Sequence, residues 1–210
     1  MISHDNSGMK RRGMLLVVSA PSGAGKTTIV KEVLSHFPSF RFSVSATTRP
    51  MRTGETDGKD YFFLTKPEFE KRIAAGDLVE YEEIYSNYYG TLKSEVEKAL
   101  SNGEDIVFDV DVKGGLSIKV KFPEAVLIFV KPPSLEILKQ RLAGRGSESP
   151  EQVEKRMARV PMELEKGELY DYIIINDELK RAVNEVFDII NRKLSERSNG
   201  KEFEGGTKAN

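Results

Sequence analysis

A glycine-rich turn between an apolar run and a helical pattern constrains the fold of this 210-residue chain more than any other feature. Residues 14–19 form the apolar run, which indicates a buried strand, and residues 20–27 follow it with the sequence Ala-Pro-Ser-Gly-Ala-Gly-Lys-Thr. Residues 27–36 then place apolar side chains on one helical face. This order is typical of a phosphate-binding loop, because backbone N–H groups and the helix N-terminus can surround a phosphate.

The loop nearly matches the pattern G-x-x-x-x-G-K-[ST], with Ala20 in place of the first glycine. Pro21 favours extended backbone at Ala20, which alanine tolerates, so the departure is mild. In such a loop Lys26 reaches the β- and γ-phosphates of a nucleotide, and the Thr27 hydroxyl can bind Mg²⁺. We expect the triphosphate to be bound by Ala20, Pro21, Ser22, Gly23, Ala24, Gly25, Lys26, Thr27 and Thr28.

The rest of the chain alternates short apolar strands with helices. We expect strands at 42–45, 61–64, 78–84, 105–111, 125–130 and 172–175, and helices at 65–75, 93–102, 116–122, 134–143 and 179–194. Another helix begins near Pro150, and Pro161 must kink it or end it early. The alternation predicts an α/β fold with a parallel sheet and right-handed crossovers.

Residues 42–92 depart from this alternation. Strand-like segments recur there with only one helix between them, and aromatic side chains cluster. We therefore predict an inserted α+β subdomain within a domain that spans residues 13–195. Residues 1–12 are expected to be a polar leader, residues 144–149 a flexible loop and residues 196–210 a flexible tail.

Charge and composition exclude several classes of protein. Lys plus Arg number 32 and Asp plus Glu number 33, so the net charge of −1 argues against a general nucleic-acid binder. The absence of cysteine excludes disulfides and thiolate metal sites. The apolar runs fall short of the ~18–20 residues of a membrane helix. We expect a cytoplasmic protein with neither nucleic acid nor membrane as a partner, and composition leaves the oligomeric state open.

Polar residues outside the phosphate loop indicate which group accepts the phosphoryl group of the bound nucleotide. A kinase that acts on an alcohol usually needs a base, whereas a nucleotide phosphate is already an anion and needs cations to hold it. Arg49 and Arg52 lie three residues apart in a turn and could both bind one phosphate. Arg141 and Arg145 lie four apart on one helical face, and the loop after them could let Arg145 and Arg156 move in as a lid.

Two acids end an apolar strand. Asp109 and Asp111 come after residues 105–108, and ligands of a parallel sheet lie beyond the carboxyl ends of its strands. This placement puts their carboxylates near the metal and the phosphates. A plainer interpretation is that these acids, like single surface arginines, are merely solvated.

Seven short motifs resemble the guanylate kinase family in order and spacing. They are SATTRPMRTGE at 45–55, GKDY at 58–61, NYYG at 87–90, DVD at 109–111, PPS at 132–134, RLAGRG at 141–146 and IND at 175–177. The resemblance covers about residues 13–195 and is far more specific than the phosphate loop alone. It implies the reaction ATP + GMP ⇌ ADP + GDP with Mg²⁺, with GMP or dGMP as acceptor. It also implies a core, a GMP-binding insertion at 42–92 and a lid at 141–160.

The resemblance also implies a role for each matching residue. Arg49, Arg52, Tyr61 and Tyr89 would hold the GMP phosphate, and Ser45, Glu80 and Thr91 would read guanine. Asp109 would lie between GMP and the metal, which Thr27 would bind, with Asp109 reaching it through water. Lys26, Arg141, Arg145 and Arg156 would stabilise the transferred phosphoryl group, and Asn176 would lie near adenine. Lys113 stands where similar proteins often carry Gln, so no role is assigned to it.

Two other functions remain open at this point. The same fold could carry a kinase for another small phosphorylated substrate. Guanylate-kinase-like domains also serve as non-catalytic interaction modules, although the presence of Lys26 and the lid arginines favours an enzyme. Taken singly, the tyrosines could be ordinary aromatic packing and Glu80 a solvated charge.

Overall fold

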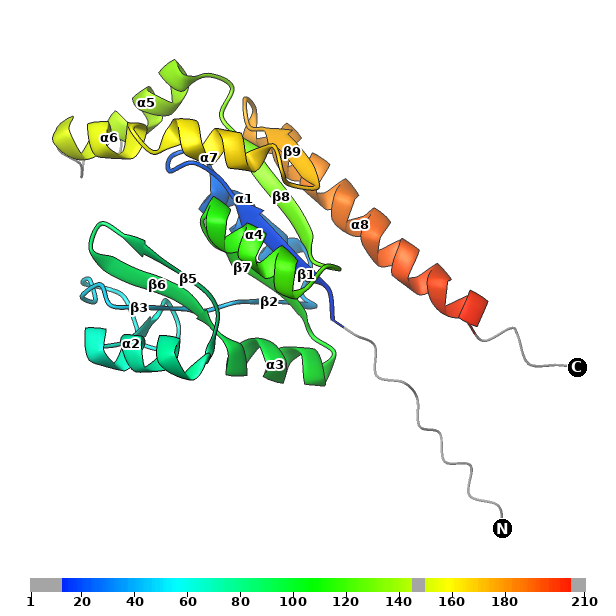
Figure 1. Cartoon of the computed structure of the whole chain (residues 1–210). Helices are drawn as coiled ribbons and strands as arrows, with labels where there is room; N and C mark the ends of the chain where they lie inside the picture. The colour runs from blue at the N-terminus through cyan, green and yellow to red at the C-terminus, as the bar shows by residue number, and fades with distance from the viewer. Residues whose placement is uncertain (1–12, 145–149, 205–210) are drawn as a thin grey trace, which may run out of the picture.

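A computed structural model describes residues 13–144 and 150–204 of the chain (Figure 1). Its centre is a five-stranded sheet in which every neighbouring pair of strands is parallel. The strand order is β2 (Phe40–Phe42), β7 (Asp105–Asp109), β1 (Leu15–Ser19), β8 (Val126–Lys131) and β9 (Tyr172–Ile175). The predicted α/β fold with a parallel sheet is confirmed.

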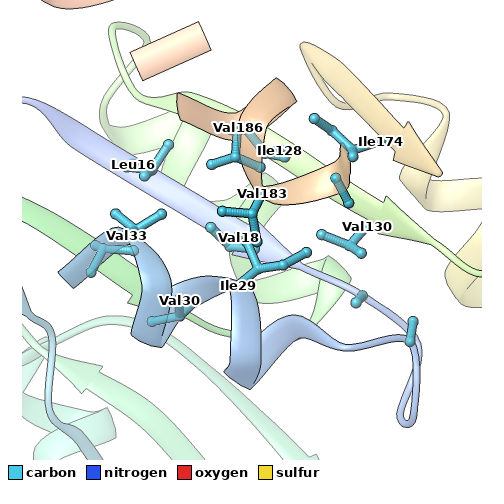
Figure 2. Close-up of a cluster of buried hydrophobic side chains, with 14 of the residues drawn as sticks. Leu16, Val18, Ile29, Val30, Val33, Ile128, Val130, Ile174, Val183 and Val186 are labelled. Carbon is cyan, nitrogen blue, oxygen red and sulfur yellow. The ribbon is translucent and has the colours of Figure 1, made fainter. Parts of the chain in front are cut away.

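Helices cover both faces of this sheet, which explains why its inner strands are apolar throughout. Leu16 and Val18 of β1 face α1 (Lys26–His36) and α8 (Leu179–Glu204), and Figure 2 shows them packed against Ile29 and Val183 of these helices. The other face packs against α3 (Lys93–Asn102), α4 (Val112–Lys121) and α7 (Val160–Gly167). Figure 1 shows α4 on the opposite side of the sheet from α1.

A second, four-stranded sheet lies within residues 45–92. Its order is β4 (Phe62–Phe63), β3 (Ser45–Thr47), β6 (Asn87–Leu92) and β5 (Leu78–Ile84), and the pairs that involve β6 are antiparallel. The helix α2 (Lys66–Ala75) buries Phe69 against this sheet and begins with the capping box expected from Thr65 and Glu68. The sheet therefore has a small core of its own, separate from the main one.

Two strand predictions in this region were wrong. The single strand expected at 42–45 is divided, because Phe40 is buried in the core of the main sheet whereas Ala46 is buried in the core of the second sheet. The strand β6 was not predicted, because its sequence Asn-Tyr-Tyr-Gly-Thr-Leu lacks the alternation typical of a strand. It forms a hairpin with β5 through a tight turn in which Tyr85 and Ser86 both have positive φ angles of 50° and 64°.

Of the two acids expected to end the strand β7, Asp109 does so and Asp111 does not. The strand stops at Asp109, and Asp111 is the N-cap of α4, where its carboxylate accepts a hydrogen bond from the Gly114 backbone N–H at 2.8 Å. The helix therefore begins at Val112, four residues before the predicted start at residue 116. Gly114 and Gly115 lie at the start of the helix, and because glycine is a poor helix former the sequence pattern did not predict a helix there.

Three helices lie between β8 and β9 in the last third of the chain. They are α5 (Leu135–Ala143), α6 (Pro150–Met157) and α7, in whose first turn Pro161 lies, so that this proline separates two helices. The last helix, α8, extends to Glu204, and the tail expected to be flexible from residue 196 is therefore helical as far as that residue. The predicted leader (1–12), the loop residues 145–149 and the residues 205–210 lie outside the described ranges.

Candidate active site

A cleft of about 890 Å³ opens at the carboxyl end of β1. One wall is the phosphate loop (residues 20–27), and the other walls come from the β5–β6 hairpin and from α6 and α7. Of the predicted triphosphate-binding residues, Ala24 alone does not line the cleft; the structure brings the others together there, along with Arg49, Arg52, Tyr89 and Arg156. The site thus forms where a parallel sheet places its ligands.

The phosphate loop depends on a glycine before α1. Gly25 is the N-cap of the helix with φ of 103°, a backbone conformation that other residues rarely adopt. A Cβ atom there would lie 2.2 Å from Nδ2 of Asn176, which donates a hydrogen bond to the Ala24 carbonyl at 2.7 Å. Asn176, predicted to lie near adenine, therefore also holds the loop from behind. Its Oδ1 is buried and has no hydrogen-bond partner among the described residues.

Lys26 joins the loop to the neighbouring strand. Its ammonium group lies 2.5 Å from the Asp109 carboxylate and donates a hydrogen bond to the Val110 carbonyl at 3.0 Å. Asp109 is the last residue of β7 and Val110 follows it, and β7 pairs directly with β1. The structure thus brings the Asp109 carboxylate beside the phosphate loop.

A smaller cavity of about 200 Å³ adjoins the cleft. Lys26, Tyr89 and Asp111 line both spaces, so the two meet at the phosphate loop. The smaller cavity is further lined by Ser45, Tyr61, Glu80 and Asp109, all of which sequence analysis had placed in the GMP site. Thr91, which was also predicted for the GMP site, is buried and donates a hydrogen bond from Oγ1 to Oε1 of Glu80 at 2.6 Å.

Glu80 is the unusual group of this cavity. Its side chain is buried in the second sheet, and burial raises its pKa to about 7, against the opposing effect of the Thr91 hydrogen bond. The nearby carboxylates of Asp111 and Glu82 raise the pKa further, whereas Lys121 lowers it. A buried carboxylate that has a single neutral donor is suited to accept hydrogen bonds from a ligand.

The two arginines of the β3–β4 loop are arranged by an acid that the sequence analysis did not single out. The Arg49 guanidinium forms two hydrogen bonds with the Glu55 carboxylate, at 2.7 and 3.0 Å, and lies over the Tyr61 ring. Glu55 also accepts a hydrogen bond from the Arg52 backbone N–H at 2.7 Å. Its position, three residues after Arg52 in the same turn, was the signal available for predicting this role.

The predicted lid arginines occupy different places. Arg156 of α6 donates a hydrogen bond to the Ser22 hydroxyl of the phosphate loop at 2.6 Å. Arg141 of α5 donates to the Asn176 carbonyl at 3.0 Å and is not among the residues that line the cleft in the described part of the chain. Arg145 lies outside the described residues.

Several charged residues in and beside the two spaces were missed: Arg159 and Glu163 line the cleft, Glu82 lines the smaller cavity, and Lys113 pairs with Glu82. Arg159, between α6 and α7, lies 3.5 Å from the Asp111 carboxylate and 3.6 Å from that of Glu163, and burial raises the pKa of Glu163. Lys113, to which no role was assigned, forms an ion pair of 2.6 Å with Glu82 of the smaller cavity. The pairs Arg159–Asp111 and Lys113–Glu82 join segments far apart in sequence, so spacing gave no sign of them, whereas Arg159 and Glu163 lie only four residues apart.

The donors present fit a metal ion that is bound mainly through a nucleotide. The Thr27 hydroxyl and the Asp109 carboxylate lie beside the phosphate loop. Within the described residues there is no cluster of three or more His, Cys, Asp or Glu side chains that could hold a metal by itself. Mg²⁺ usually takes one or two protein oxygens and completes its shell with phosphates and water, so this sparse donor set suits it.

Comparison with known proteins identifies the family. The family model "Guanylate kinase" matches residues 12–193. This chain belongs to the guanylate kinase family. Among guanylate kinases, that of Symbiobacterium thermophilum is 50% identical over 181 residues, 86% of each chain. That of Chlorobium luteolum is 47% identical over 188 residues, 89% of this chain and 95% of the other.

The fold agrees with a solved member of the guanylate kinase family. The crystal structure of guanylate kinase from Anaplasma phagocytophilum superposes with a TM-score of 0.68 at 27% sequence identity. The match covers 88% of this chain and 87% of that one. As in other enzymes of the family, the chemistry is that of a nucleoside monophosphate kinase. In the described part of the chain, no helix is both long and apolar enough to cross a bilayer.

Proposed function

We propose that this protein transfers the γ-phosphoryl group of ATP to GMP or dGMP and so produces ADP and the corresponding diphosphate. The observation that carries the proposal is the position of Lys26, where the phosphate-loop cleft meets the cavity that contains Glu80. A triphosphate on the loop and a purine nucleotide with its base at Glu80 would place their phosphates on either side of this ammonium group. Membership of the guanylate kinase family supports the choice of both nucleotides.

The transfer needs no general base. A phosphate oxygen of GMP attacks the γ-phosphorus, and the bond between that phosphorus and the β–γ bridging oxygen breaks, so that ADP leaves. Because the nucleophile is already an anion, the task of the protein is to hold two polyanions together and to stabilise charge in the transition state. Lys26 and Arg156 reach the phosphate loop, and we assign this stabilisation to them, together with Arg141 and Arg145.

The acceptor phosphate has its own cations. Arg49 and Arg52 line the cleft on the side of the second sheet, and Tyr61 and Tyr89 stand between them and the Glu80 cavity. Glu55 orients the Arg49 side chain and the Arg52 backbone through its hydrogen bonds. We assign the GMP phosphate to these four side chains, since guanidinium groups match phosphate oxygens in geometry.

The base is read by the buried carboxylate. Guanine presents two adjacent donors, N1–H and the 2-amino group, and a single carboxylate can accept from both. Glu80 has this capacity, with Thr91 and Ser45 beside it. We also place adenine near Asn176, which holds the phosphate loop from behind and is not among the described residues that line the cleft.

Mg²⁺ would be held by the Thr27 hydroxyl and, through water, by Asp109. When bound, the ion neutralises charge on the β- and γ-phosphates. Asp109 pairs with Lys26, which holds its carboxylate where the two substrate spaces meet.

We also propose that residues 42–92 act as the GMP-binding part and residues 141–160 as a lid that closes on it. Arg156 reaches the phosphate loop from α6, and Arg159 lies over the Tyr85 ring at 5.9 Å, so that the helical segment already touches both sides of the cleft. Closure would exclude water from the transfer. Small-angle scattering should show a smaller radius of gyration with a bisubstrate analogue, and an unchanged radius would contradict the lid assignment.

The reaction itself is tested with a panel of acceptors. Coupled ADP-release assays with GMP, dGMP, AMP, UMP and CMP, each with and without Mg²⁺, should give turnover with the guanine nucleotides and the metal. Rapid turnover of another monophosphate in place of GMP would favour a different substrate on this fold. Absence of turnover with every acceptor would favour a non-catalytic interaction module.

A further inference from the structure

A glycine in the first turn of α4 has no local reason to be there. Gly114 lies within the helix, is buried, and has a negative φ angle, so its backbone conformation is open to any residue. Glycine is among the poorest helix formers, and alanine the best. A residue that weakens its own helix in this way needs an explanation from its surroundings.

The surroundings of Gly114 are the carboxylate of Glu80. A Cβ atom at position 114 would lie 2.7 Å from Oε2 of Glu80 and 3.2 Å from its Cδ atom. Carbon and oxygen atoms that are not bonded to each other do not approach so closely. The carboxylate therefore occupies the space that a side chain of any other residue would take.

The remaining contacts of Glu80 leave it little freedom to move aside. Its other oxygen, Oε1, is held by the Thr91 hydroxyl at 2.6 Å. The strand that carries it is held at its start by Lys121 of the same helix α4, whose ammonium group donates to the carbonyl oxygens of Leu78 and Val79. The pairing of β5 with β6 shifts register between Leu78 and Glu80, so this anchor lies where the strand would otherwise be least regular.

We propose that Gly114 is a positioning residue for base selection: by lacking a side chain, it lets the Glu80 carboxylate rest against the first turn of α4 in the orientation that reads guanine. The inference rests on the proposed function, in which Glu80 is the guanine acceptor. Helix α4 packs on the main sheet, whereas β5 is a strand of the second sheet. A helix that packs on the main sheet therefore completes the base pocket, which is otherwise formed by the second sheet.

The test is the variant Gly114→Ala. The added methyl group should displace the carboxylate and lower kcat/KM for GMP about 10²-fold, the scale for a misplacement of about 1 Å at a reacting or binding group. Most of this loss should appear in KM for GMP, whereas KM for ATP stays within about twofold, because the phosphate loop is untouched. The AMP/GMP ratio of kcat/KM should rise.

A second substitution separates this contact from a general disturbance of α4. Glu80→Asp shortens the side chain by one methylene group and makes room for the new methyl. In the Glu80→Asp background, Gly114→Ala should cost at least ~10-fold less than in the parent, because residues in contact are coupled and distant ones are not. Ser117→Ala, an exposed position in the same helix, is the matched control and should leave the kinetics unchanged.

Each outcome decides. If the parent phosphorylates GMP and Glu80→Gln alters base choice but Gly114→Ala changes neither KM nor the ratio, the inference is wrong while the proposed function stands. Equal losses in both backgrounds would also overturn it. If the parent does not use GMP, the proposed function itself fails. If the parent uses GMP but Glu80→Gln leaves base choice unchanged, Glu80 is not the guanine reader and the inference is overturned with that assignment. If Gly114→Ala does not fold, recovery of folding by Glu80→Asp supports the contact, and continued failure overturns it.

Discussion

The ammonium group of Lys26 lies 2.5 Å from the carboxylate of Asp109. This ion pair joins the phosphate loop to the end of β7 at the base of the site. A lysine held in this way has its charge oriented before the triphosphate arrives, which is the condition for strong electrostatic stabilisation of a transition state.

Replacement of Lys26 by Ala should affect chemistry more than folding. We expect kcat to fall by ~10²–10³-fold or more, the scale for loss of one preorganised stabilising donor. The melting temperature should change little. Steady-state kinetics and a thermal melt check this, with Lys31→Ala on the exposed face of α1 as the control. Parent-like turnover, or an unfolded variant, would be incompatible with the assigned role.

Glu80→Gln should change the choice of base. The neutral amide can accept only one of the two guanine donors, whereas it can donate to the bare N1 of adenine. Sites built on such hydrogen bonds reject analogues that lack them by about 10⁴–10⁵ in kcat/KM. The variant should therefore lose a large part of its discrimination between guanine and adenine. We expect kcat/KM for GMP to fall strongly and the AMP/GMP ratio to rise. Glu83→Gln, exposed on the same strand, is the control, and a constant ratio would exclude Glu80 as the guanine reader.

GMP affinity should depend on pH because the pKa of Glu80 is raised to about 7. The groups that face this carboxylate are the Thr91 hydroxyl, the carboxylates of Asp111 and Glu82, and the Lys121 ammonium group. Guanine donors need the ionised form, so the protonated fraction, which grows below pH 7, must lose its proton on binding. The dissociation constant should therefore rise as pH falls, approaching about tenfold per pH unit well below the pKa.

Calorimetry at pH 5.5–8.5 measures this effect, and buffers of different ionisation enthalpy report the released proton. The phosphate of GMP also titrates near pH ~6, so the matched reference is Glu80→Gln, which retains that titration alone. Identical pH profiles for the parent and this variant would contradict the prediction.

Tyr170→Phe should destabilise the fold. The Tyr170 hydroxyl lies 2.8 Å from the Ser19 hydroxyl and 3.0 Å from the Val112 carbonyl, and Ser19 in turn donates to the carbonyls of Val110 and Asp111. Removal of this buried hydroxyl leaves its partners unsatisfied, which costs about 1–3 kcal/mol in free energy of unfolding. Urea unfolding measures the change, with half-exposed Tyr81→Phe as the control. Equal stability of the two variants would show that the network contributes nothing.

The sequence predicted those parts of the molecule that depend on local patterns. Buried strands such as β1 and β8, the capping box of α2 and the phosphate loop each have a signal within a few residues. The errors arose where tertiary packing decides. The chain around Ser43 passes from one sheet to another without a break in composition, and α4 begins with glycines that only Glu80 and Tyr170 explain.

The candidate site shows the same division. Motif positions such as Ser45, Glu80 and Asp109 were found by resemblance and do line one cavity. The pairs Lys113–Glu82 and Arg159–Asp111 join residues 31 and 48 positions apart, and no short-range pattern encodes them. The hydrogen bond between Arg141 and the Asn176 carbonyl is likewise a property of the folded chain.

The way the chain leaves and re-enters the main sheet has a consequence for how such enzymes diversify. It leaves at Phe42 at the end of β2 and returns at Asp105 at the start of β7, and these two strands are hydrogen-bonded neighbours. Because the two strands are parallel, with Phe42 opposite Val107 and Asp105 opposite Phe40, the excursion leaves at one end of the strand pair and returns at the other, and its helix α3 packs against the main sheet. A different segment in this place would therefore have to span both ends of the strand pair and supply a helix that covers the main sheet as α3 does. Gly114 marks the point where a new excursion would still have to fit the old helix.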